Sequence, residues 1–161
     1  MKRDRTEGLA GGHADPPELP DELYALTLHQ PWATAVAVLG KRIENRSWAP
    51  PRRAVGQWIA IHAGRAFDDG AADWVASRTG RMTTDGSVPR GAIVALARVA
   101  GSVTDSDDMW FRGPCGWLLE DVVPVEPVAC RGRQRLWKVS PDVRMALEEA
   151  LKSQTKTVIV D

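Results

Sequence analysis

Residues 26–32 read Leu-Thr-Leu-His-Gln-Pro-Trp, and residues 41–48 read Lys-Arg-Ile-Glu-Asn-Arg-Ser-Trp. The first stretch predicts a short strand, from Tyr24 to Leu28, that turns into a helix at Pro31, because proline suits the first position of a helix. The helix is expected to run from about Trp32 to Leu39. The second stretch then predicts a strand at a sheet edge, so the two together indicate a compact strand–helix–strand junction.

The second stretch gathers charged side chains at this junction. Because successive side chains of a strand point to opposite faces, Ile43 is expected on one face and Glu44 and Arg46 together on the other. Lys41 lies where the helix passes into the strand, and strict alternation need not hold there. The structural interpretation is that Glu44 neutralises Arg46 or Lys41 in an ion pair. The functional interpretation is that the three bind phosphate or carboxylate, or transfer protons.

Outward from the junction, the chain alternates between short strands and helices. Further strands are predicted over residues 56–64, 91–103, 115–125 and 136–139, with a candidate edge strand over 157–160, and further helices over 67–79 and 141–152. Five to six strands with about three helices imply an α+β domain, most economically a small closed or nearly closed β-barrel. Residues 1–22 are rich in Gly, Pro, Asp and Glu and predict a disordered tail, which leaves residues 23–161 as one domain.

Composition excludes several classes of protein. Of 161 residues, 43% are hydrophobic and 26% charged, as in ordinary soluble domains, and no apolar run approaches the ~18–20 residues of a membrane span. The first residues are not followed by an apolar segment, so no secretory signal is expected and a cytoplasmic location is predicted. Two cysteines, Cys115 and Cys130, and three scattered histidines give neither a disulfide framework nor a zinc set. We therefore expect no metal and no cofactor.

The formal net charge is zero, but the positive charge is unevenly distributed. Residues 41–65 hold six basic side chains and one acidic one, and residues 131–138 hold four basic side chains and no acidic one. Two such blocks can form one basic face on a neutral protein. Alternatively, these are solvated strand edges, where Lys and Arg are common.

The stretches quoted first resemble the ASCH domain, a family of the PUA-like superfamily. Its Gly-x-Lys-x-x-Glu-x-Arg signature is matched in its three charged positions by Lys41, Glu44 and Arg46, whereas the glycine position is Leu39 here and Gly40 follows it. Further similar stretches occur in the same order, up to about residue 140: 26–32, 61–64, 91–94, 116–117, 130–132 and 136–137. The resemblance implies a PUA-like barrel flanked by helices, with a cleft at the three charged residues.

The same resemblance implies a partner, because related PUA-like domains bind RNA and some hold a single modified base in an aromatic pocket. The sequence contains seven Trp against two Phe and one Tyr. Most of the tryptophans are expected in the core and about two in the cleft, where aromatic faces stack on unpaired bases. We therefore predict binding of RNA or another single-stranded nucleic acid, with a modified base as one candidate. The expected binding residues are Gln30, Trp32, Lys41, Glu44, Arg46, Trp48, His62, Trp117 and Arg131.

Two alternatives stay open. The first is a hydrolase that acts on RNA or a modified nucleoside, with Lys41 and Glu44 catalytic. Short bacterial ASCH proteins that remove the acetyl group of N4-acetylcytidine carry a threonine nucleophile where this chain has Glu44, and a carboxylate cannot replace that hydroxyl. His62 is a further catalytic candidate, although a lone histidine in an apolar strand is more often structural. The second alternative is a cleft that serves a small metabolite.

Overall fold

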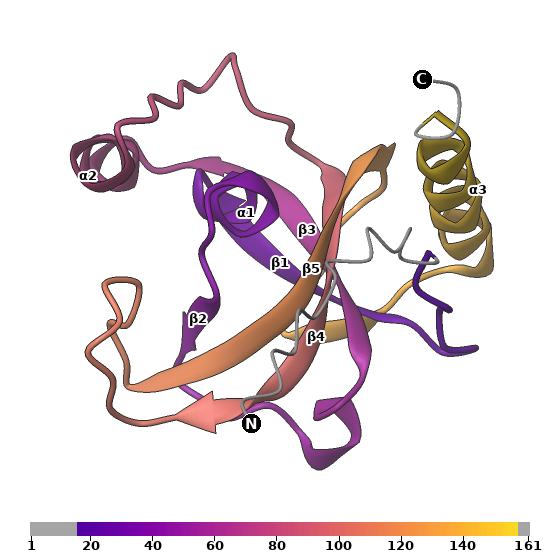
Figure 1. Cartoon of the computed structure of the whole chain (residues 1–161), viewed down its shortest axis with the longest axis horizontal. Helices are drawn as coiled ribbons and strands as arrows, with labels where there is room; N and C mark the ends of the chain where they lie inside the picture. Colours follow the sequence, from indigo (N-terminus) through magenta and orange to yellow (C-terminus); the bar gives the residue numbers. More distant parts are fainter. Residues whose placement is uncertain (1–15, 158–161) are drawn as a thin grey trace, which may run out of the picture.

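The computed structural model describes residues 16–157 (Figure 1). The elements follow in the order β1 (Tyr24–Gln30), α1 (Trp32–Val38), β2 (Ile43–Arg46), a 3₁₀ turn η1 (Arg52–Ala54), β3 (Trp58–Phe67), α2 (Asp69–Thr79), β4 (Ala92–Val103), β5 (Cys115–Ala129), β6 (Leu136–Lys138) and α3 (Pro141–Thr157). The predicted α+β class is confirmed, and so are the strand–helix–strand junction and the three helices.

The strands form a single mixed sheet in the order β2-β5-β4-β3-β1-β6. Neighbouring strands run antiparallel except β1 and β3, which are parallel. Parallel strands need a long connection, and here α1 and β2 form part of it. The prediction of a closed or nearly closed barrel is not confirmed, since within the described residues β2 and β6 are the two edges of an open sheet. The sheet is nonetheless strongly curved, and α1 fills its concave side (Figure 1).

A side chain connects strands near the two ends of this curved sheet. Strand β6 pairs with β1 only from Tyr24 to Leu26. Just beyond that pairing, the backbone carbonyl of Thr27 accepts a hydrogen bond from Arg46 of β2, with 2.8 Å between Nη2 and O. Arg46 thus reaches from β2 to β1, across the opening that backbone hydrogen bonds between strands would close in a barrel.

The two faces of the sheet carry separate hydrophobic cores. One core surrounds α1 and includes Ile59 and Ile61, and the other lies under α3 and includes Ala60 and Leu147. Successive residues of β3 therefore point to opposite faces of the sheet, and each face is covered by one helix. Among the described residues, no helix has the length and apolar character needed to cross a membrane.

The predicted N-terminal tail and the predicted C-terminal edge strand both lie partly outside the described residues. Residues 1–15 of the predicted tail lie outside the described residues, but residues 16–22 do not behave as a tail. Leu19 is buried in the core under α3, and Arg144 of that helix donates hydrogen bonds to the carbonyls of Leu19 and Pro20. The candidate edge strand was predicted over residues 157–160. Its first residue, Thr157, is the last residue of α3, and residues 158–160 lie outside the described residues.

Candidate functional site

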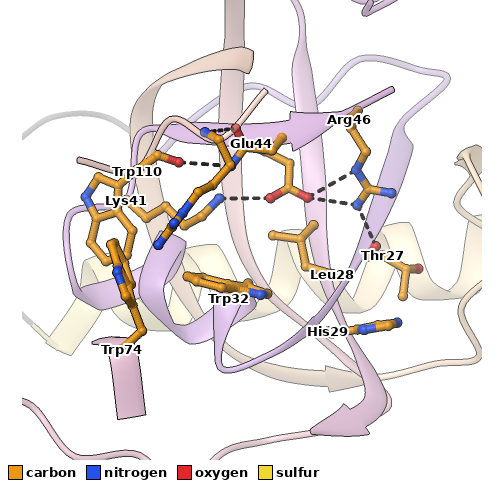
Figure 2. Close-up of a pocket in the computed structure, with 11 residues that line it drawn as sticks. Thr27, Leu28, His29, Trp32, Lys41, Glu44, Arg46, Trp74 and Trp110 are labelled. Atoms are coloured by element: carbon orange, nitrogen blue, oxygen red, sulfur yellow. Dashed lines mark hydrogen bonds and ion pairs between the residues drawn. The ribbon is translucent and has the colours of Figure 1, made fainter. Parts of the chain in front are cut away.

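A cavity of about 320 Å³ opens where the end of β1 meets α1 and β2, with α2 and the 104–114 loop as its remaining walls. We call it the tryptophan pocket. Figure 2 shows its lining residues, which are Thr27, Leu28, His29, Trp32, Lys41, Glu44, Asn45, Arg46, Trp74, Trp110 and Arg112.

The signature residues meet in one wall of this pocket. Lys41 and Glu44 are 2% and 7% exposed, and Lys41 Nζ lies 2.8 Å from Glu44 Oε1. Lys41 also donates to the carbonyl of Ile43. Arg46 holds the other carboxylate oxygen, with Nε and Nη2 at 3.1 and 2.9 Å from Glu44 Oε2. The ion pair that the structural interpretation predicted for Glu44 is therefore present, and the Glu44 carboxylate is shared by Lys41 and Arg46 (Figure 2).

Three tryptophans form the opposite wall. Trp32 begins α1, Trp74 lies in α2 and Trp110 in the 104–114 loop, and their ring centroids are 5.5–6.4 Å apart in tilted or edge-to-face arrangements. Trp32 and Trp74 are half-buried, so part of each ring is open to the pocket. Cations lie over two of the rings, Lys41 Nζ at 5.7 Å from the Trp32 centroid and Arg112 Cζ at 4.5 Å from that of Trp74.

Asn45 attaches the loop to the sheet. Its amide nitrogen donates to the carbonyl of Trp110 at 2.9 Å, and its amide oxygen accepts from the backbone N–H groups of Arg112 and Gly113 at 2.7 and 3.0 Å. One side chain of β2 thus fixes the residues that bring an indole and a guanidinium to the pocket.

Several predicted site residues lie away from this pocket. Gln30 is fully buried, where its side chain accepts from the N–H of Thr34 and donates to the carbonyl of Pro89. Trp117 is fully buried as well and donates through Nε1 to the carbonyl of Trp48. The two indoles pack edge to face at 4.8 Å, in the core around α1. These three residues hold the junction together and do not line its pocket.

His62 and Arg131 line a second cavity of about 750 Å³, which we call the arginine pocket. Its lining residues are Thr27, His62, Gly64, Arg65, Gly91, Cys130, Arg131, Gly132, Arg133 and Gln134. His62 is 1% exposed, and its hydrogen bonds fix its tautomer. Since a carbonyl can only accept, Nε2–H donates to the Cys130 carbonyl at 2.9 Å, which leaves Nδ1 to accept.

The acceptor nitrogen of His62 faces Thr27 Oγ1 at 3.2 Å, and that hydroxyl accepts from Trp137 Nε1 at 3.0 Å. A chain of hydrogen bonds thus runs from Trp137 through Thr27 to a neutral His62. Burial lowers the pKa of His62 below its ordinary 6.5, and the hydrogen bond to the Cys130 carbonyl opposes that shift. Burial also raises the pKa of the Cys130 thiol, with a backbone hydrogen bond opposing the shift. Within the part of the chain that the structure describes, no group of three or more His, Cys, Asp or Glu side chains is arranged to hold a metal ion.

No protein-family model and no curated protein matches the sequence. The structure, however, is similar to crystal structures of the ASCH protein from Zymomonas mobilis and of two mutants of it, each with a TM-score of 0.50 and 16% sequence identity over 78% of this chain. The matches cover 93–96% of those chains. The chain has an ASCH-like fold. At this identity the likeness extends to the fold alone, and at that level the resemblance seen in the sequence is confirmed.

Within the ASCH-like fold, the pocket also takes residues that sequence reasoning missed. Trp74 lies in the helix predicted over residues 67–79, and nothing in that segment indicates which helix covers the junction. Trp110, Arg112 and His29 carry no local pattern at all. The unusual number of tryptophans was the available signal, and it predicted an aromatic wall. Of Trp32, Trp48 and Trp117, which were the predicted candidates, only Trp32 lines the pocket.

Proposed function

We propose that this ASCH-like domain binds RNA or another single-stranded nucleic acid and holds one nucleotide in the tryptophan pocket. The observation that carries the proposal is the pairing of an aromatic wall with a cationic one in a cavity that holds one small ligand. A volume of about 320 Å³ lies at the lower end of the ~300–1,000 Å³ usual for such sites. That volume suits a single nucleotide unit.

The charges of the pocket favour an anionic ligand. Lys41, Arg46 and Arg112 outnumber Glu44, which gives the lining a formal charge of +2. Because Glu44 is shared by Lys41 and Arg46, the guanidinium of Arg112 is the cation of this set with no carboxylate in contact among the described residues. Arg112 is exposed at the rim, beside Trp74, where a phosphate next to a stacked base would lie.

Binding without hydrolysis accounts best for the chemistry of the lining. A nucleophile would need a hydroxyl or thiol with a base beside it. Thr27 carries the hydroxyl among the lining residues, and the base beside it, Nδ1 of His62, belongs to the arginine pocket and does not line the tryptophan pocket. Both oxygens of Glu44 already accept hydrogen bonds from Lys41 and Arg46, which favours a structural role for this carboxylate.

The first test measures stacking separately from charge. A pool of random single-stranded RNA pentamers and a polyphosphate of equal charge are titrated into the protein and into a Trp74→Ala variant. We expect the RNA to bind more tightly than the polyphosphate, and the variant to lose roughly 5- to 150-fold in RNA affinity, the equivalent of one stack of about 1–3 kcal/mol. Trp58→Ala is the matched control, because Trp58 is also half-buried with an arginine over its ring but lies outside the pocket lining.

Equal affinity for RNA and polyphosphate, or equal losses in Trp74→Ala and Trp58→Ala, would overturn the proposal. A parallel incubation with a mixed pool of modified and unmodified RNA, followed by mass analysis of nucleosides and fragment lengths, tests the hydrolase alternative. Product that is formed by the protein and not by a Lys41→Ala variant would establish that alternative. An RNA pool that is neither altered nor retained would leave a small metabolite as the better candidate ligand.

A further inference from the structure

The arginine pocket is strongly basic and contains no opposing charge. Arg65, Arg131 and Arg133 line it, no Asp or Glu does, and all three side chains are exposed. None of the three forms an ion pair within the described residues, in contrast to Arg90, Arg98 and Arg144, which all have carboxylate partners. Three uncompensated guanidinium groups around one cavity make a site for anions.

The arginine pocket is large enough for such a ligand. Its other lining residues include Gly64, Gly91, Gly132 and the neutral ring of His62, none of which carries a charge. A volume of about 750 Å³ exceeds what one small anion needs. The size and the spread of the arginines favour several anionic groups in series over a single ion.

The arginine pocket adjoins the tryptophan pocket. Thr27 lines both, with its carbonyl held by Arg46 on one side and its hydroxyl held by His62 on the other. Because β6 stops pairing with β1 at Leu26, no strand covers the edge of β1 at this point. The two cavities therefore share a boundary at Thr27, and a strand that occupied both would run past this residue and the Arg46 side chain beside it.

Further positively charged side chains lie close to the boundary between the two pockets. Arg46 is 22% exposed in its side chain and lies at the tryptophan pocket. Arg135, in the segment that leaves the arginine pocket, has its guanidinium 4.7 Å from the ring centroid of Trp48.

We propose that the arginine pocket binds the phosphodiester groups of nucleotides adjacent to the one held in the tryptophan pocket, so that the ligand is a strand and not a mononucleotide. This inference rests on the proposed function and specifies its substrate class. Arg131, Arg133 and Arg65 contact backbone phosphates and carry no base preference, since phosphate contacts position a strand without reading its sequence.

The test compares a strand with its monomers. Random single-stranded RNA pentamers and a mixture of the four nucleoside 5′-monophosphates are bound to the wild type and to an Arg131→Gln/Arg133→Gln variant over a series of salt concentrations. The double variant is expected to bind the pentamers about tenfold more weakly at 0.1 M salt and to bind the monophosphates within twofold of the wild type. Its slope of log affinity against log salt should fall by about 1.4, because each phosphate contact to a single strand contributes about 0.7. Arg52→Gln/Arg53→Gln removes the same charge from the η1 turn, outside both pockets, and should leave pentamer binding and its slope unchanged.

Each contrary result has a distinct meaning. Monophosphates that bind the wild type as tightly as pentamers do would overturn the strand inference and leave the nucleotide pocket intact. Equal losses in the two double variants would also overturn it, because the effect would then be one of net charge. Inorganic phosphate that is retained through Arg131 and Arg133, without any gain for pentamers, would identify a free-phosphate site instead. Failure of the wild type to bind either nucleic-acid probe would overturn the proposed function itself.

Discussion

Glu44 carries the electrostatic balance of the tryptophan pocket. It lies between Lys41, which is 2% exposed, and Arg46, and its single negative charge pairs with both cations. Removal of one partner from a buried ion pair leaves an uncompensated charge, which costs about 3–5 kcal/mol. We predict that Glu44→Gln, which keeps the shape of the side chain, lowers the free energy of unfolding in urea by about 3 kcal/mol.

The matched control for Glu44→Gln is Glu22→Gln. Glu22 pairs with Lys138 at 3.0 Å, but these side chains are 64% and 56% exposed, and exposed pairs contribute about 0.2–1 kcal/mol. Unfolding free energies that fall by the same small amount in both variants would contradict a buried role for the Glu44 carboxylate.

Gly132 illustrates how one missing side chain shapes the arginine pocket. A Cβ atom at this position would lie 2.6 and 2.7 Å from ring atoms of His62 and 2.8 Å from Thr27 Oγ1. His62 is buried and Thr27 half-buried, and the two are hydrogen-bonded to each other. Because neither side chain is free to move away, we predict that Gly132→Ala destabilises the protein by about 1–3 kcal/mol, as overpacking in a core does. Thermal unfolding measures the effect. Gly86→Ala is the control, since a Cβ there meets nothing within 4 Å, and a similar loss in both variants would contradict the steric argument.

At the scale of elements, β2 holds the 104–114 loop through Asn45. The amide oxygen of Asn45 accepts from the N–H groups of Arg112 and Gly113. We predict that Asn45→Ala accelerates hydrogen exchange at these two amides by at least tenfold and weakens RNA binding, because Trp110 and Arg112 lose their fixed position. Asn45→Asp keeps an oxygen acceptor at the same place and should retain most of the protection.

Hydrogen-exchange mass spectrometry or NMR measures this effect at single sites. The N–H of Leu119, which donates to the carbonyl of Arg42, serves as an internal reference because Asn45 does not touch it. Exchange at Arg112 and Gly113 that is as slow in Asn45→Ala as in the wild type would show that the loop is held by other contacts.

The existence and order of the elements could be predicted from the sequence, whereas some of their ends could not. Alternation and proline signals located all six strands, but Pro124 and Pro127 predicted that β5 ends near residue 125. In the structure β5 continues to Ala129. Strand β2 pairs with β5 only at residues 115–118, and beyond them no described strand pairs with that edge of β5. Gln154 of α3 bonds there to the Pro124 carbonyl and the Glu126 N–H, so a proline without an N–H group breaks no strand pairing. Local sequence does not show which edge of a strand will be unpaired.

The residues of the candidate site likewise differ in whether the sequence could predict them. Lys41, Glu44 and Arg46 come together because they are neighbours in one short segment, and strand alternation was sufficient to predict their meeting. Trp74 and Trp110 join them from segments 26 and 62 residues beyond Trp48. Their positions depend on how α2 and the 104–114 loop pack against α1, and no local pattern encodes that packing.

At the scale of the whole molecule, the fold leaves a gap between β2 and β1 and uses it. A closed barrel would occupy the opening with backbone hydrogen bonds, whereas here Arg46 reaches across it to Thr27. Thr27, at this opening, lines both the tryptophan pocket and the arginine pocket. The sequence predicted a closed or nearly closed barrel, whereas the described sheet is open, and the proposed ligand path depends on that opening.

The hydrogen-bond chain at Thr27 and His62 connects global stability to pH. The pKa of His62 is lowered in the folded protein, so the unfolded chain, with an ordinary value of 6.5, takes up its proton first as the pH falls. The contribution of His62 to stability is therefore fully present above pH 6.5 and is lost as the pH falls through 6.5 toward the lowered folded value. The loss can reach about 1.4 kcal/mol per pH unit for one group.

We predict that the free energy of unfolding decreases more steeply between pH 6.5 and 5.5 in the wild type than in His62→Gln. Carboxylates contribute to both curves alike, so the difference between the two isolates the imidazole. Urea unfolding at pH 7.5, 6.5 and 5.5 gives the curves, and an NMR titration of the folded wild type gives the His62 pKa directly. Parallel unfolding curves, together with an NMR pKa at or above 6.5, would mean that His62 is not held neutral and that the hydrogen-bond chain from Trp137 does not run in the direction its geometry indicates.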